Sequence, residues 1–186
     1  MITHIIWDLG DTINNPPTGG QDLKPLDEYL EIQLRPDVKE TLENLSGRGY
    51  IHAVLSNTAT TDSDGARRML ERLGVADSFS FIYATQSELS KDKPQKPSPV
   101  VFEIVLKALG IYPEQAVMVG NSWDTDMIGA NRSGIHGIWL QNPSVSVRKD
   151  TTTLLRLPPW IIPVWDIAEV PHALELLNKS AVFENS

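Results

Sequence analysis

The sequence predicts an α/β fold, a Rossmann-like three-layer sandwich in which a mostly parallel sheet lies between two layers of helices. Short apolar runs rich in β-branched residues alternate with helical segments along the chain, which is typical of parallel sheets. Apolar residues follow one another within these runs, as expected for strands covered on both faces. The length of 186 residues suits one substantial core, so we expect a single domain over residues 1–186.

The first third of the chain contains one strand, one long excursion and one helix. Residues 2–7 are short, apolar and β-branched, and they predict the first strand. Residues 14–36 break the pattern with Asn-Asn-Pro-Pro and Gly-Gly, which are strong loop signals. Loops of this length often act as flaps over a site. Pro36 and Asp37 then begin a helix that Gly47 ends.

The rest of the chain continues the alternation of strands and helices. Further strands are expected at residues 50–55, 79–84, 116–119, 135–140 and 161–165. Further helices are expected at residues 65–73, 99–109, 124–133 and 167–177. The Ser/Thr/Pro-containing stretch 141–159 is expected to be irregular.

Composition excludes several classes of function. The absence of cysteine excludes disulfides, thiolate catalysis and cysteine-ligated zinc. The formal charge of −8 argues against a nucleic-acid partner, because phosphate backbones require a basic surface. No apolar run is long enough to span a bilayer, and no basic segment precedes a long apolar stretch. We therefore expect no membrane partner and a cytoplasmic location.

Polar residues follow four of the expected strands. Because the carboxyl ends of parallel strands lie at one edge of the sheet, these side chains can converge. A carboxylate nucleophile, a hydroxyl donor, a lysine and a metal-ligating acid at one edge suit phosphoryl transfer. The residues are Asp8 after the first strand, Ser56 and Asn57 after the second, Lys96 after the third, and Asn121 and Asp126 after the fourth.

Four stretches carry these residues in a recognisable order: IIWDLGDT, AVLSNT, KPSPVVF and VMVGNSWDTDMIGANRSG. Together they resemble the motifs of the haloacid dehalogenase (HAD) superfamily, whose members are mostly phosphatases with an aspartate nucleophile. The resemblance extends to about residue 140 and implies a HAD-like fold.

The resemblance implies a role for each polar residue. Asp8 would attack phosphorus and form an aspartyl phosphate, which splits one displacement into two steps. Ser56 would donate a hydrogen bond to the phosphoryl group, Asn57 would contribute to substrate binding, and Lys96 would neutralise charge on the nucleophile and substrate. Asp8, Ser56 and Lys96 are therefore the expected catalytic residues. The expected substrate is a small phosphorylated molecule that the sequence does not identify.

The resemblance also implies a magnesium ion, which would screen the repulsion between carboxylate and phosphate. Its expected ligands are Asp8, the backbone carbonyl of Gly10, Asn121 and Asp126, because Mg²⁺ prefers oxygen. The superfamily has an aspartate where this chain has Asn121. An amide oxygen brings no charge, so we expect a weaker metal site in which Asp126 carries more of the binding, directly or through water.

A second departure from the superfamily pattern is Gly10. The superfamily phosphatases have an aspartate two residues after the nucleophile, which protonates the leaving group and then activates water. Such catalysis contributes roughly 10²–10⁴-fold. The side chain of the adjacent Asp11 is expected to point elsewhere. We therefore expect slow hydrolysis of esters with poor leaving groups.

The spacing between the motifs leaves little room for a large cap domain, so the chain is similar to the capless (subfamily III) phosphatases. An open site is typical of a large substrate or of closure by another subunit, which leaves homo-oligomerisation open. Two other interpretations remain. The superfamily's dehalogenases also lack the second aspartate, and two altered positions are also compatible with a catalytically weakened phosphate-binding or regulatory protein.

Overall fold

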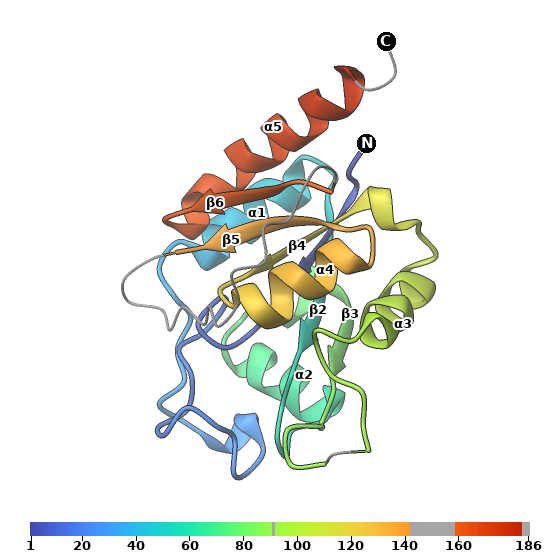
Figure 1. Cartoon of the computed structure of the whole chain (residues 1–186). Coiled ribbons are helices and arrows are strands. Elements are labelled where there is room, and N and C mark those ends of the chain that lie inside the picture. The colour runs from blue at the N-terminus through green and yellow to red at the C-terminus, as the bar shows by residue number, and fades with distance from the viewer. Residues whose placement is uncertain (91, 142–158, 184–186) are drawn as a thin grey trace.

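The computed structural model describes residues 1–90, 92–141 and 159–183 and contains a six-stranded sheet (Figure 1). The strand order is β3-β2-β1-β4-β5-β6, and every neighbouring pair is parallel. The strands are β1 (His4–Trp7), β2 (Ile51–Ser56), β3 (Phe79–Ala84), β4 (Ala116–Gly120), β5 (His136–Leu140) and β6 (Ile161–Val164). The predicted parallel, Rossmann-like α/β fold is confirmed.

Five α-helices of the described residues cover the two faces of the sheet (Figure 1). They are α1 (Val38–Gly47), α2 (Ser63–Arg72), α3 (Pro99–Leu109), α4 (Ile128–Arg132) and α5 (Val170–Phe183). Helices α1, α2 and α5 share one apolar core with the sheet, and α3 and α4 share the other. In the described part of the chain, no helix is both long and apolar enough to cross a membrane.

The segment expected to form one helix over residues 124–133 differs from that expectation. A π-helix over Trp123–Met127 precedes the short α4. The N–H groups of Asp126 and Met127 both donate to the carbonyl of Ser122, at 3.0 and 3.2 Å. This wider turn is a form that periodicity does not indicate, and such turns are frequent at functional sites.

Residues 14–36 leave the sheet after β1 and return at α1. They contain one short 3-10 helix, Leu26–Glu28, which packs against α2. Between β2 and α3 the described residues form α2, the 3-10 helix Ala76–Ser78, β3 and a loop. Most of the stretch 141–159 lies outside the described residues.

Candidate active site

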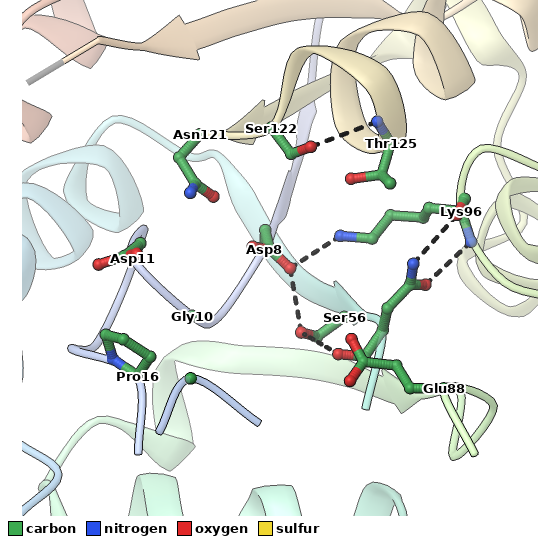
Figure 2. Close-up of a pocket in the computed structure, with 12 residues that line it drawn as sticks. Asp8, Gly10, Asp11, Pro16, Ser56, Glu88, Lys96, Asn121, Ser122 and Thr125 are labelled. Carbon is green, nitrogen blue, oxygen red and sulfur yellow. Dashed lines mark hydrogen bonds and ion pairs between the residues drawn. The ribbon is translucent and has the colours of Figure 1, made fainter. Parts of the chain in front are cut away.

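The predicted residues meet where the strand order reverses. Strands β1 and β4 are neighbours in the sheet, with β2 and β3 added on the outer side of β1, and β5 and β6 added on the outer side of β4. Ligands of open α/β sheets bind at such points. Asp8 directly follows β1 and Asn121 directly follows β4. A cavity opens there, and its lining includes Asp8, Gly10, Ser56, Lys96 and Asn121 (Figure 2).

Asp8 is held by two donors from different strand ends. The Lys96 Nζ lies 2.7 Å from Asp8 Oδ1, and the Ser56 hydroxyl donates to the same oxygen at 3.0 Å (Figure 2). Asp8 is 8% exposed and Lys96 is 3% exposed, so the ion pair is largely shielded from water. Shielded charges interact more strongly than they would in water, which holds Asp8 in a defined orientation.

Lys96 is shared between two carboxylates. Its Nζ also lies 2.6 Å from Oδ1 of Asp126, which is fully buried. Burial by itself lowers the pKa of Lys96, but the carboxylates of Asp126 and Asp8 outweigh this and keep the pKa above its ordinary value. Lys96 therefore stays charged at neutral pH.

Asp126 is fitted closely into its position. Burial raises its pKa to about 6, against the opposing effect of the Lys96 ammonium. Its Oδ2 accepts a hydrogen bond from the Ser122 N–H at 2.9 Å. A Cβ at position 120 would collide with this carboxylate, so the close approach requires Gly120.

Asn57 contacts the backbone of Lys96 in both directions. Its Nδ2 donates to the Lys96 carbonyl at 3.0 Å, and its Oδ1 accepts from the Lys96 N–H at 2.9 Å. Asn57 thus positions the lysine-bearing loop against β2. Asn57 also lines the cavity, and its predicted contact with substrate remains a prediction.

The oxygen atoms around the cavity fit the predicted magnesium ion. The carboxylate of Asp8, the backbone of Gly10 and the amide of Asn121 line it, and all offer hard oxygen ligands. Both oxygens of Asp126 already accept hydrogen bonds, so its contribution to a metal site stays a prediction. Within the described residues, no group of three or more His, Cys, Asp or Glu could hold a metal. A cation here would therefore need carbonyl and amide oxygens in addition to the Asp8 carboxylate.

Gly10 and Asp11 show how far the chain departs from a two-aspartate site. Gly10 presents open space, since a Cβ there would meet no atom within 4 Å. The Asp11 carboxylate lies 3.5 Å from the Arg35 guanidinium. The ion pair directs the Asp11 carboxylate toward Arg35, although Asp11 also lines the cavity with Asp8.

Two residues near the cavity have no counterpart among the predicted residues. Asp22 lines an adjoining cavity, and its carboxylate accepts hydrogen bonds from the N–H groups of Ala59, Thr60 and Thr61. Glu88 lines both cavities. No motif in the neighbouring sequence identifies Asp22 as a residue near the site. Glu88 follows β3 at the carboxyl edge, so the strand-end argument that selected Lys96 could also have found it.

Comparisons with known proteins identify the family of the chain. The profile of the family described as haloacid dehalogenase-like hydrolase matches residues 22–140. The chain belongs to this family. The predicted membership of the HAD superfamily is thereby confirmed.

A similar solved structure comes from Listeria monocytogenes serotype 4b and is described as an uncharacterized protein. It is 50% identical, has a TM-score of 0.93, and the alignment covers 96% of this chain and 99% of that one. This HAD chain therefore has a relative of the same length and fold.

Curated HAD relatives include both phosphatases and dehalogenases. The ribulose-1,5-bisphosphate 5-phosphatase of Halopiger xanaduensis is 36% identical over 62% of this chain and 46% of that protein. The (S)-2-haloacid dehalogenase 4A of Burkholderia cepacia is 31% identical over 59% of this chain and 44% of that protein. The chain thus spans less than half the length of these two relatives.

Proposed function

We propose that this HAD hydrolase is a Mg²⁺-dependent phosphatase that hydrolyses a phosphomonoester through an aspartyl phosphate at Asp8. The observation that carries the proposal is the pair of contacts on Asp8 Oδ1, from Lys96 Nζ at 2.7 Å and Ser56 Oγ at 3.0 Å. These contacts orient the carboxylate and place a cation and a hydroxyl donor on Oδ1, which leaves the other oxygen, Oδ2, for the reaction. Oδ2 is the oxygen that we expect to attack.

In the first step, an oxygen of Asp8 forms a bond to phosphorus while the bond between phosphorus and the leaving-group oxygen breaks. The Lys96 ammonium and the Ser56 hydroxyl stabilise the negative charge on the phosphoryl oxygens. The leaving alcohol takes its proton from water, because Gly10 has no acid to supply. Water then hydrolyses the aspartyl phosphate, which releases inorganic phosphate and restores the Asp8 carboxylate.

Magnesium would be held by Asp8, the Gly10 carbonyl and Asn121, and Asp126 is the remaining candidate. Bound there, it would neutralise charge on the phosphoryl group and on the nucleophile. Asn121 contributes no charge, so we expect Mg²⁺ to bind more weakly than at a site with an aspartate in its place.

The test is release of inorganic phosphate from a panel of phosphomonoesters with and without Mg²⁺. We expect Mg²⁺-dependent turnover that the Asp8→Asn variant abolishes. The exposed Asp77, on the turn before β3, provides a matched Asp77→Asn control that should behave like the wild type. The absence of any Asp8-dependent turnover across the panel would refute the proposal.

A second candidate is a dehalogenase reaction at the same aspartate. It is favoured by Gly10, which stands where the phosphatases of the superfamily have their second aspartate, and by the dehalogenase among the similar proteins. Release of halide from 2-haloacids in excess chelator would select this candidate. Tight binding of phosphate without turnover of either substrate class would instead select a binding or regulatory protein.

A further inference from the structure

A second cavity adjoins the phosphoryl site around Asp8, on the side of the 14–36 segment. Ser56 and Asn57 line both cavities, and Asp22 of the segment lines the second one. The Asp22 side chain is buried, and burying a carboxylate is costly unless hydrogen bonds compensate for the lost water. Asp22 is therefore a buried carboxylate that the proposed reaction does not use, and its partners indicate its role.

The carboxylate of Asp22 is bound by the loop that follows β2, residues 57–61. It accepts hydrogen bonds from the N–H groups of Ala59 and Thr61, both at 2.7 Å, and of Thr60 at 3.0 Å. The hydroxyls of Thr60 and Thr61 also donate to it. Successive backbone N–H groups that converge on one point bind anions, and hydrogen bonds to a charged acceptor are stronger than neutral ones. The chain thus supplies its own anion to this loop.

The same loop begins with Asn57, whose side chain fixes the backbone of Lys96. Its Nδ2 donates to the Lys96 carbonyl at 3.0 Å, and its Oδ1 accepts from the Lys96 N–H at 2.9 Å. Lys96 in turn holds its ammonium 2.7 Å from Asp8 Oδ1 (Figure 2). A continuous series of contacts therefore connects Asp22 to the nucleophile through the loop 57–61 and Lys96.

Hydrogen bonds within and around the loop connect its two ends. The Thr58 hydroxyl donates to the Thr61 carbonyl at 2.7 Å, and the Thr58 carbonyl accepts from the Ser87 N–H at 2.8 Å. All three residues are buried. A shift of residues 59–61 would have to break buried hydrogen bonds or move Asn57 as well, and breaking buried hydrogen bonds is costly. The position of Asn57 therefore depends on how residues 59–61 are held.

We propose that Asp22 is a positioning residue of the phosphoryl site, which acts through Asn57 to hold Lys96 against Asp8. The proposal rests on the phosphatase function proposed above and identifies a residue that its rate requires. Because Asp22 acts on the alignment of Lys96 and not on the substrate itself, its loss should lower kcat more than it raises KM.

Turnover of p-nitrophenyl phosphate with Mg²⁺ by the Asp22→Asn variant tests the proposal. Asparagine keeps the size and one acceptor oxygen, but it removes the charge and places an N–H donor among the N–H groups of the loop. We expect kcat to fall about ten- to a hundredfold and KM to change by less than about threefold, because a small misplacement of a catalytic group lowers the rate this much. A kcat equal to that of the wild type would overturn the proposal.

Asp27 provides the matched control, because it lies in the same segment and also holds it in place. Its carboxylate pairs with the Arg68 guanidinium of α2 at 2.6 Å. Asp27→Asn therefore removes a charged contact between the segment and α2 and leaves the Asp22 carboxylate on the loop 57–61. We expect Asp27→Asn to keep the kcat of the wild type. Equal losses of kcat in Asp22→Asn and Asp27→Asn would show that any loosening of the segment lowers the rate, which contradicts the proposal.

A double-mutant cycle shows whether the effect passes through Asn57. Asn57→Ala removes both contacts with the Lys96 backbone. Asp22→Asn should then lower kcat by a much smaller factor in the Asn57→Ala background than in the wild type, because residues that act through one another are not additive. The same factor in both backgrounds would mean that Asp22 acts on the fold in general, and the proposal would be wrong.

Amide hydrogen exchange gives a readout that does not require turnover. The Lys96 N–H is bonded to Asn57 Oδ1, so its exchange reports the contact through which Asp22 is proposed to act. We expect this N–H to exchange at least about tenfold faster in Asp22→Asn than in the wild type, through local opening of the loop. Its exchange should be unchanged in Asp27→Asn.

The Asp8 N–H is the internal reference for this experiment. It donates to the Val119 carbonyl at 2.9 Å between the central strands, so its exchange reports a general loosening of the fold. In Asp22→Asn the exchange at Asp8 should accelerate by a smaller factor than at Lys96, and equal factors at both would overturn the proposal. If the wild type hydrolyses no phosphoester, including p-nitrophenyl phosphate, the proposed phosphatase function fails. The exchange at Lys96 then still decides whether Asp22 positions this residue.

Discussion

Gly10 is the residue at which this chain differs most from a two-aspartate phosphatase. It lines the cavity with Asp8, and its backbone lies outside the left-handed region that favours glycine. A Cβ at this position would meet no atom within 4 Å, so the space for an acid is present although the acid is not. The consequence of Gly10 is thus chemical and leaves the packing of the site unaffected.

The Gly10→Asp variant is expected to increase turnover of esters with poor leaving groups, because it places an acid beside Asp8. The turnover rate should increase at least about tenfold. The upper limit is the roughly 10²–10⁴-fold that general acid–base catalysis contributes. Steady-state rates on an alkyl phosphate and on p-nitrophenyl phosphate measure it, and the alkyl ester should gain more. Gly10→Asn has the same shape without the acid, so equal gains from both variants would contradict this explanation.

At the scale of elements, the 14–36 segment is attached to the loop after β2 chiefly through one side chain. The carboxylate of Asp22 accepts from the N–H groups of Ala59 and Thr61, both at 2.7 Å, and of Thr60 at 3.0 Å. It also accepts from the Thr61 hydroxyl. The loop so held begins with Asn57, next to Ser56, so this attachment connects the wall of the second cavity to the phosphoryl site.

The Asp22→Ala variant should lower the free energy of unfolding by about 2–4 kcal/mol, because it leaves several N–H groups without their charged acceptor. Urea unfolding followed by tryptophan fluorescence measures the change. Asp22→Asn keeps one acceptor oxygen and should lose less. The exposed Asp77 supplies the Asp77→Ala control, and a loss no greater than that of the control would show that the segment is held by other contacts.

At the scale of the whole molecule, a buried pair of rings in the central strands links stability to pH. His52 in β2 is 1% exposed, and its Nδ1 accepts from the Trp7 indole N–H in β1 at 3.0 Å. Burial lowers the pKa of His52 to about 4, although the nearby Leu42 backbone opposes the shift. Protonation of Nδ1 would also place two N–H donors against each other. The folded chain therefore keeps His52 neutral.

We expect the free energy of unfolding to fall as the pH drops from about 6.5 to about 4. Above pH 6.5 both folded and unfolded chains hold the imidazole neutral, but below it the unfolded chain binds a proton that the folded chain does not. The loss should reach roughly 3 kcal/mol, since each pKa unit corresponds to about 1.4 kcal/mol. Urea unfolding at pH 7 and pH 4 measures it.

The His52→Gln variant is the control for this titration. Glutamine can accept from the Trp7 N–H but does not ionise in this range. The decrease in stability between pH 7 and pH 4 should be smaller in His52→Gln than in the wild type. Equal decreases would mean that carboxylates alone set the acid stability.

The layered fold, and the edge of the sheet at which the site lies, could be predicted from the amino-acid sequence. Strands that are apolar throughout and alternate with helices predict a parallel sheet, because that arrangement buries both faces of each strand. The carboxyl ends of parallel strands lie at one edge of the sheet, which brings Asp8, Ser56, Lys96 and Asn121 together. The order of the four motifs also identified the superfamily, which the family profile confirms. These properties depend on the order of apolar and polar residues over short stretches, which can be read directly from the sequence.

Which atoms meet at that edge could not be predicted from the sequence and follows from the folded arrangement of the chain. It pairs Lys96 with both Asp8 and Asp126, turns Asn57 onto the Lys96 backbone, and brings Asp22 and Glu88 to the cavities. These contacts join positions that lie 30 to 88 residues apart along the chain. A hydrogen bond depends on a few tenths of an ångström and on loop directions, so it is set by the packing of the complete fold.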